Sequence, residues 1–205
     1  MEITSWTTAD FAAMEQRYRA AFFNSLGGFK SLTLVGTMNN DGQTNLSVVS
    51  SVFHIGANPP LIGMIFRPES AERHTLDNIM QTGQYTFNHV TEDFYKQAHQ
   101  TSARYDREVS EFDACGLQPW YSEKLKAPYV QESNVKIGIE LAERIDLKIN
   151  GTVMLLGKIV EVFIPTDCIE IDGFVNIEIA GSITVSGLDS YHTTNHIERL
   201  PYAKP

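Results

Sequence analysis

Residues 42–53 read Gly-Gln-Thr-Asn-Leu-Ser-Val-Val-Ser-Ser-Val-Phe, and this stretch determines how the rest of the chain is interpreted. Its β-branched residues predict a strand, and the preceding Asn39-Asn40-Asp41-Gly42 predicts a hairpin turn because Asn and Gly tolerate positive φ. Side chains alternate between the two faces of a strand. The pattern therefore predicts one face with Asn45, Ser47, Val49 and Ser51, and an opposite face with Leu46, Val48 and Ser50.

Outward from this strand, the hydrophobic pattern predicts many strands and few helices. We expect strands near 31–38, 61–66, 84–90, 135–146, 149–163 and 179–187. We expect helices near 7–25, 71–82, 92–103 and 106–115, a loop at 118–131 and a polar C-terminal tail at about 189–205. Close turns and the lack of regular strand–helix alternation favour a mainly β, closed or partly closed barrel. No linker divides the 205 residues, so we expect one domain over 1–205 with a helical insertion at about 91–131.

Composition excludes several function classes. Sixteen Lys and Arg against 25 Asp and Glu give a net charge of −9, which argues against a nucleic-acid-binding surface. No apolar run is long enough to span a bilayer, and Met1–Trp6 lacks the basic start of a signal peptide. Cys115 and Cys168 match no disulfide or metal motif, so we expect free thiols in a cytoplasmic protein.

The polar face of the 42–53 strand is the first candidate binding element. An amide and neutral hydroxyls, from Asn45, Ser47 and Ser51, suit the carbonyls and ring nitrogens of a flat polar ring such as a flavin. The competing interpretation is an ordinary solvent-exposed strand face.

A helix start follows that suits a phosphate. Arg67, Arg73, His74 and Thr75 lie just before or within the first turn of the expected 71–82 helix. Unpaired N–H groups and the positive end of the helix dipole attract an anion there, and basic residues in a first turn oppose that dipole unless an anion is bound. The competing interpretation is a solvated helix end.

The remaining motifs are weaker. His192 and His196 are four residues apart, but no third ligand is near, so we expect no metal site. His192 follows a strand, where the mouth of a barrel would lie. The chain has no GxGxxG, P-loop, GxSxG or HExxH motif, so a nicotinamide cofactor would have to bind over another cofactor.

Three segments together resemble the flavin reductase-like family, which are FMN-binding split β-barrel proteins that include flavoredoxins and monooxygenase reductase components. They are Asn45-Leu46-Ser47 through Ser51, then Asn58-Pro59-Pro60-Leu61, then Thr75-Leu76-Asp77-Asn78-Ile79 ahead of Gly83-Gln84-Tyr85-Thr86-Phe87-Asn88.

The resemblance implies a Greek-key split β-barrel with flanking helices, a homodimer and bound FMN. It places Asn45, Leu46 and Ser47 on the isoalloxazine, and Ser50 and Ser51 near the ribityl chain or phosphate. Arg67, His74 and Thr75 would hold the phosphate, joined by Arg73 from the helix-start argument. His192 would help to place the nicotinamide.

We therefore expect an FMN-dependent enzyme that passes a hydride from NADH or NADPH to flavin, supplying reduced flavin or electrons to an acceptor such as a monooxygenase or another redox protein. One alternative is a flavoredoxin-like electron-transfer protein reduced by a partner, with loop 118–131 covering the flavin. Another is a barrel that binds a small ligand or another chain without redox chemistry.

Overall fold

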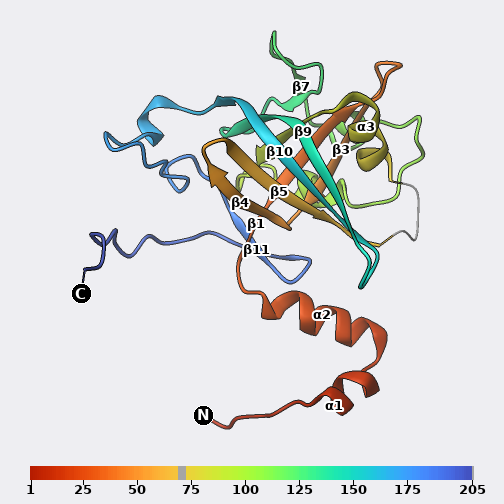
Figure 1. Cartoon of the computed structure of the whole chain (residues 1–205), viewed down its shortest axis with the longest axis vertical. Helices are drawn as coiled ribbons and strands as arrows, with labels where there is room; N and C mark the ends of the chain where they lie inside the picture. The colour runs from red at the N-terminus through yellow and green to blue at the C-terminus, as the bar shows by residue number, and fades with distance from the viewer. Residues whose placement is uncertain (69–72, 205) are drawn as a thin grey trace.

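A seven-stranded antiparallel sheet forms the body of the molecule in the computed structural model, which describes residues 1–68 and 73–204 (Figure 1). In spatial order its strands are β3 (Thr44–Val49), β2 (Thr33–Met38), β6 (Gln84–His89), β9 (Lys136–Leu147), β10 (Thr152–Phe163), β5 (Pro60–Phe66) and β4 (Val52–Ala57). The edge strands β3 and β4 follow one another in the chain and are separated only by Ser50 and Ser51. The predicted strand at 42–53 is thus two strands, because the chain turns at these two serines.

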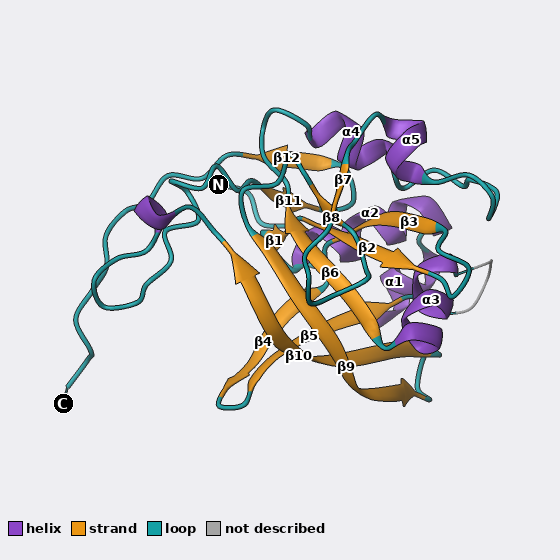
Figure 2. Ribbon diagram, turned by 90° about the horizontal axis from the view of Figure 1, so that it is seen from above, coloured by secondary structure: helices purple, strands orange, loops and turns teal. Residues whose placement is uncertain are grey.

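Two smaller sheets complete the β structure. One has the order β1 (Lys30–Ser31), β11 (Thr184–Ser186) and β12 (Ser190–His192), and the other pairs β7 (Pro119–Trp120) with β8 (Tyr129–Val130). Strand β12 lies inside the segment predicted as a polar tail, so that part of the prediction is wrong. Residues 193–204 run without regular structure, as Figure 2 shows.

Hydrophobic side chains of β2 pack on both sides of the strand. Leu34 joins a cluster with residues of α4 (Tyr95–Gln100) and α5 (Glu111–Cys115), whereas Val35 joins the cluster between the barrel strands and α3 (His74–Thr82). Helices α4 and α5 are shorter than the predicted 92–103 and 106–115. Residues 71 and 72 of the predicted 71–82 helix lie outside the described residues, and α3 ends at Gly83 with φ of 69°, which favours glycine.

The predicted helix at 7–25 is two helices, α1 (Thr8–Ala13) and α2 (Gln16–Leu26). The break follows from Glu15, whose carboxylate accepts the backbone N–H groups of Arg17 at 2.8 Å and Tyr18 at 3.1 Å and so starts a new helix. Neither helix has a buried residue, and both stand away from the sheet in Figure 1. Their aromatic side chains pack on one another instead, for example Phe11 on Phe23 with ring centroids 5.0 Å apart.

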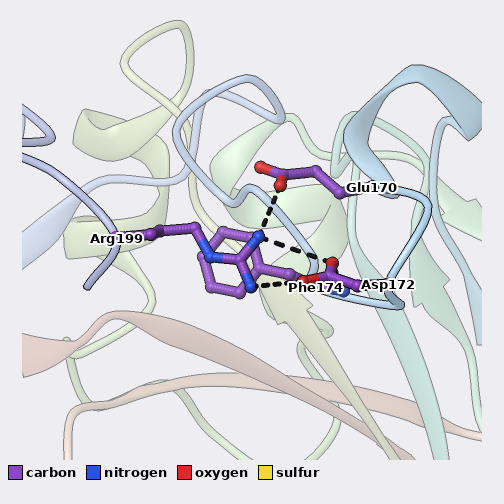
Figure 3. A network of polar contacts seen from close by, with 4 residues as sticks. All are labelled: Glu170, Asp172, Phe174 and Arg199. Atoms are coloured by element: carbon purple, nitrogen blue, oxygen red, sulfur yellow. Dashed lines mark hydrogen bonds and ion pairs between the residues drawn. The ribbon is translucent and has the colours of Figure 1, made fainter. Parts of the chain in front are cut away.

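A polar network holds the C-terminal segment to the loop that follows β10 and a short 3-10 helix, η1 (Thr166–Cys168), and Figure 3 shows it. The Arg199 guanidinium donates to Glu170 Oε2 at 2.5 Å and to Asp172 Oδ2 at 2.6 Å. It also lies 4.1 Å from the centroid of the Phe174 ring. The hydrogen bonds from Arg199 lower the pKa of the Asp172 carboxyl.

Candidate functional site

A cleft of about 1060 Å³ opens where β3, the end of β5 and the start of α3 meet; we call it the β3–α3 cleft. All the predicted cofactor-binding residues except Leu46 line it: Asn45, Ser47, Ser50, Ser51, Arg67, Arg73, His74 and Thr75. The polar strand and the basic helix start, separated by more than 20 residues of sequence, therefore form a single site.

The two elements are joined by a buried chain of hydrogen bonds. The Asn45 side-chain amide donates to Thr75 Oγ1 at 2.9 Å, and the Thr75 hydroxyl donates to Ser47 Oγ at 2.9 Å. Asn45 is 7% exposed and Thr75 is 7% exposed, so these bonds are shielded from water. The alternation of β3 places Asn45 and Ser47 on the same face, as predicted, and α3 contributes the hydroxyl between them.

Basic side chains line the same cleft near the start of α3. Arg73 donates a hydrogen bond from Nη2 to the backbone carbonyl of Arg67, while its buried Nη1 has no hydrogen-bond partner among residues 1–68 and 73–204. Arg73 is also the N-cap residue of α3, and its own side chain makes no capping hydrogen bond. A buried guanidinium nitrogen and the backbone N–H groups of a helix start are both groups that an anion would satisfy.

β3 is an edge strand, and one of its outward-facing amides is already bonded. The Leu46 amide donates to Glu111 Oε2 of α5 at 2.9 Å, and the Leu46 side chain is fully buried in the core. Leu46 therefore lies outside the cleft lining. Since outward-facing amides recur every second residue, the amide of Val48, which does line the cleft, also faces away from β2.

Glu111 is a buried acid that lines the cleft, and the sequence analysis did not identify it. Burial raises the pKa of its carboxyl, and the hydrogen bond from Leu46 and the charge of His74 lower the pKa by smaller amounts. No periodicity or motif marks Glu111, because its contacts are to a strand 65 residues earlier.

His192 also lies outside the cleft lining. Its Nε2 is 2.8 Å from Ser186 Oγ and 3.2 Å from Ser190 Oγ, and its ring contacts Phe29. The neighbouring Tyr191 lines the cleft instead, with its hydroxyl 2.5 Å from Nδ1 of His99, which is also a lining residue. Neither His99 nor Tyr191 was singled out from the sequence.

The aromatic loop at 118–131 packs against the barrel away from the cleft. Trp120 and Tyr129 pack on Phe163 of β10, with ring centroids 4.8 and 5.5 Å from it, and the Tyr129 hydroxyl donates to Glu161 at 2.7 Å. Burial raises the pKa of the Tyr129 phenol. None of these aromatic residues lines the cleft.

Within residues 1–68 and 73–204, no helix is long and apolar enough to cross a bilayer. No three His, Cys, Asp or Glu side chains there come together in a way that could hold a metal ion.

Comparison with known proteins gives a family match and a full-length structural match. The model of the flavin reductase like domain matches residues 29–172. A protein from Shewanella frigidimarina, provisionally assigned as a flavin reductase with a split barrel domain, is 50% identical. That match covers 98% of this chain and 100% of the other, with a TM-score of 0.94, and it confirms the predicted mainly β split barrel.

One more distant solved structure agrees in fold, and one curated relative matches in sequence. Nitrilotriacetate monooxygenase component B from Bacillus cereus is 20% identical, with 98% of this chain and 100% of that chain covered and a TM-score of 0.83. An uncharacterized protein from Aquifex aeolicus is 28% identical over 109 residues. That alignment covers 52% of this chain and 56% of the Aquifex protein, so the chain spans about half the length of this curated relative.

Proposed function

The chain belongs to the family of flavin reductase-like domains, and we propose from this premise that it binds FMN in the β3–α3 cleft and transfers a hydride from NADH or NADPH to the flavin. The observation that carries the proposal is that the hydrogen-bonded chain Asn45–Thr75–Ser47 lines the same cleft as Arg73, whose buried Nη1 has no hydrogen-bond partner within the described part of the chain.

The residues at the start of α3 fit the phosphate of FMN. Among the described residues the buried Nη1 of Arg73 has no hydrogen-bond partner, and the Arg73 side chain makes no capping hydrogen bond to the backbone N–H groups at the start of α3. Arg67 and His74 line the same part of the cleft and add positive charge or hydrogen-bond donors. The like charges of these basic side chains repel one another, and a phosphate dianion would offset that repulsion.

The edge of β3 fits the polar edge of the ring. Asn45 and Ser47 supply an amide and a hydroxyl that Thr75 holds in place, and the outward amide of Val48 supplies a backbone donor. Because Leu46 is turned into the core, we assign the ring contacts of this strand to Asn45, Ser47 and Val48.

Bound FMN would supply the redox chemistry, accepting the hydride that leaves the nicotinamide and passing two electrons to an acceptor. The residues of the protein would position the FMN. Hydrogen-bond donors from Asn45, Ser47 and Val48 would favour negative charge on the pyrimidine edge of the flavin. Thr75 already fixes the side chains of Asn45 and Ser47, so these two need no reorganisation when the flavin binds. Fixed donors in a partly buried cleft would hold the ring in place for the transfer.

Titration with FMN, followed by quenching of its fluorescence, tests the binding step. We expect R73Q to weaken FMN binding at least tenfold, since a hydrogen bond to a charged group contributes about 1.5–3 kcal/mol. K126A removes a charge from an exposed lysine on the loop away from the cleft and serves as the control. Wild-type protein that takes up no FMN, or R73Q that titrates like K126A, would refute the proposal.

The alternative of an electron carrier without NAD(P)H activity depended on loop 118–131 covering the flavin. That loop packs on β10 instead and leaves the cleft open, which favours the reductase. Steady-state oxidation of NADH and NADPH by the FMN-loaded protein decides between the two, because a carrier shows little turnover without its partner.

We also propose that the protein acts as a cytoplasmic homodimer. Exposed aromatic side chains of α2, among them Tyr18 at 52% and Phe23 at 44% exposed, would be covered by a second copy. Both cysteines are free, as in a reducing compartment. Light scattering of the purified protein tests the dimer. A redox partner such as a monooxygenase remains part of this proposal.

A further inference from the structure

Residues 107–111, a short loop and the first residue of α5, bond to both elements that form the β3–α3 cleft; we call them the 107–111 segment. β3 is the last strand on its side of the seven-stranded sheet, and among the described strands it pairs with β2 alone. The other side of an edge strand is held by whatever packs against it. The exact position of β3 at the cleft therefore depends on the 107–111 segment.

Three hydrogen bonds at successive positions join this segment to the edge of β3. They are Gln43 Nε2 to the carbonyl of Arg107, Thr44 Oγ1 with Ser110 Oγ at 2.7 Å, and Leu46 N to Glu111 Oε2 at 2.9 Å. The bond to Glu111 is the most shielded from water, because Glu111 is 6% exposed and Leu46 is fully buried. Phe112, the next residue of α5, lies in the same hydrophobic cluster as Leu46.

The 107–111 segment is also tied to α3. Arg107 Nη2 lies 2.7 Å from Asp77 Oδ2, and the two side chains are 38% and 48% exposed, so this ion pair adds little stability by itself. Its effect is geometric, because the residue whose carbonyl accepts a bond from Gln43 is thereby joined to the helix on the other wall. The walls that carry Asn45 and Thr75 are thus linked through this segment as well as directly.

The carboxyl group of Glu111 is unfavourable to the ligand that we place in the cleft. Glu111 lines the cleft, where a carboxylate would repel a phosphate dianion and the electron-rich edge of a flavin. Burial also disfavours the charged form and raises the pKa of this carboxyl. A residue with both disadvantages needs a compensating role, and the bond that it makes is to the amide of Leu46, between Asn45 and Ser47.

We propose that Glu111 is a positioning residue for the FMN site, which holds the cleft-lining edge of β3 in place through the Leu46 amide. The inference rests on the proposed function and adds to it a residue that acts on FMN through the strand. Outward-facing amides are two residues apart, about 6.8 Å along the strand, so fixing Leu46 also fixes the Val48 amide that we assign to the ring. Asn45 and Ser47 flank the same anchor point.

Titration with FMN, followed by quenching of its fluorescence, compares wild type, E111Q, E111L and S133A at a temperature where urea unfolding shows all four to be folded. E111Q keeps an oxygen that accepts the Leu46 N–H and removes the negative charge, so it should bind FMN as tightly as wild type or more tightly. E111L removes the acceptor together with the charge and should weaken FMN binding about tenfold.

Ser133→Ala is the control for a loss of stability alone. It removes the buried hydrogen bonds from Ser133 Oγ to the carbonyls of His89 and Val135, and Ser133 does not line the cleft. FMN affinity in S133A should equal that of wild type, although S133A should be less stable. E111L therefore has to lose affinity as well as stability for the positioning role to hold.

The directions of the two Glu111 changes separate positioning from the other roles of a buried acid. Tighter binding in both E111Q and E111L would mean that Glu111 acts through its charge alone. Wild-type affinity in E111L, as in S133A, would mean that Glu111 serves stability alone. Equal losses in E111Q and E111L would mean that the bond to Leu46 is not what matters. Each of these results would overturn the proposal.

A double variant, Q43A/S110A, tests the same idea at residues that do not line the cleft, and it decides the question if E111L does not fold. It removes two of the three bonds to β3 and should weaken FMN binding about threefold without any contact with the ligand. The affinity of S133A in this variant would contradict the positioning role. A wild-type protein that binds no FMN would remove the proposed function itself, whereas normal FMN binding unaffected by E111L and Q43A/S110A removes only the role of Glu111.

Discussion

The hydroxyl of Thr75 is the link between the two halves of the FMN site, and its removal should affect both stability and cofactor binding. Thr75→Val keeps the shape of the side chain but removes the acceptor of Asn45 Nδ2 and the donor to Ser47 Oγ. Asn45 is 7% exposed, so its amide would be left without water as well as without Thr75.

A buried polar group that loses its partner costs about 1–3 kcal/mol, whereas the partly exposed Ser47 can bond to water and adds little. We therefore expect T75V to lower the free energy of unfolding by about 1–3 kcal/mol. In a chain of this size each kcal/mol lowers Tm by about 2–4 °C. The FMN dissociation constant should rise about tenfold, because Asn45 and Ser47 would no longer be held toward the ring.

Thr75→Ser is the matched control, because it keeps the hydroxyl and loses only a methyl group. Urea unfolding gives the stability of each variant, and quenching of FMN fluorescence gives the affinity at a temperature where all three proteins are folded. T75S should bind FMN within about twofold of wild type. If T75V binds FMN as tightly as T75S, the hydrogen-bonded chain does not organise the site.

Three further predictions concern the rest of the molecule. Burial lowers the pKa of His89 from 6.5 to about 4. Between these two pH values the unfolded chain binds a proton at His89 that the folded chain does not bind. The wild-type free energy of unfolding should therefore fall by up to about 3 kcal/mol between pH 6.5 and 4. Urea unfolding should show that loss largely absent in H89N and still present in H54N, an exposed histidine; equal slopes in both variants would contradict it. Burial raises the pKa of Glu111, so its stabilising contribution is complete below the ordinary value of 4.5 and is lost as pH rises; E111Q should gain stability relative to wild type from pH 4.5 to neutrality, and a constant difference would exclude this. A Cβ on Gly157 would lie 2.1 Å from the Tyr85 hydroxyl, so G157A should cost about 1–3 kcal/mol by thermal unfolding, with part of that loss recovered in G157A/Y85F; G56A, whose Cβ has room, should cost little, and equal losses would rule out overpacking.

The sequence predicted those features of the site that depend on local pattern. Alternation within β3 placed Asn45 and Ser47 on one face and Leu46 in the core, and the structure agrees through Val49. The pattern failed at Ser50 and Ser51, because a polar residue that continues a strand and one that turns the chain have the same composition. The helix at 7–25 failed for a related reason, since the apolar spacing continued through the break while the Glu15 cap depended on local hydrogen bonds.

The part of the cleft lining that comes from α4, the loop at 101–106 and β12 could not be predicted, because its residues meet only through the fold. His99 and Tyr191 are 92 residues apart, and their bond exists because α4 and β12 pack on the same side of the barrel. Arg104 stands in a segment without periodicity, where one exposed arginine has no signal that separates it from any other. Glu111 needed the knowledge that β3 is an edge strand whose amides require acceptors.

Tyr191 and His192 are neighbours in β12, and a shift of one residue along the strand decides which of the two side chains faces the cleft. The prediction placed His192 just past a strand, near the barrel mouth, whereas His192 is the last residue of β12 itself. Because neighbouring residues of a strand point to opposite faces, only one of the two can face the cleft. His192 is on the face that meets Ser186 of β11 and Phe29, while Tyr191 is on the face that meets Tyr95 and His99. A strand of three residues is too short for its sequence to show which face is buried. The sequence analysis therefore selected His192 for its chemistry, whereas the neighbouring Tyr191 lines the cleft.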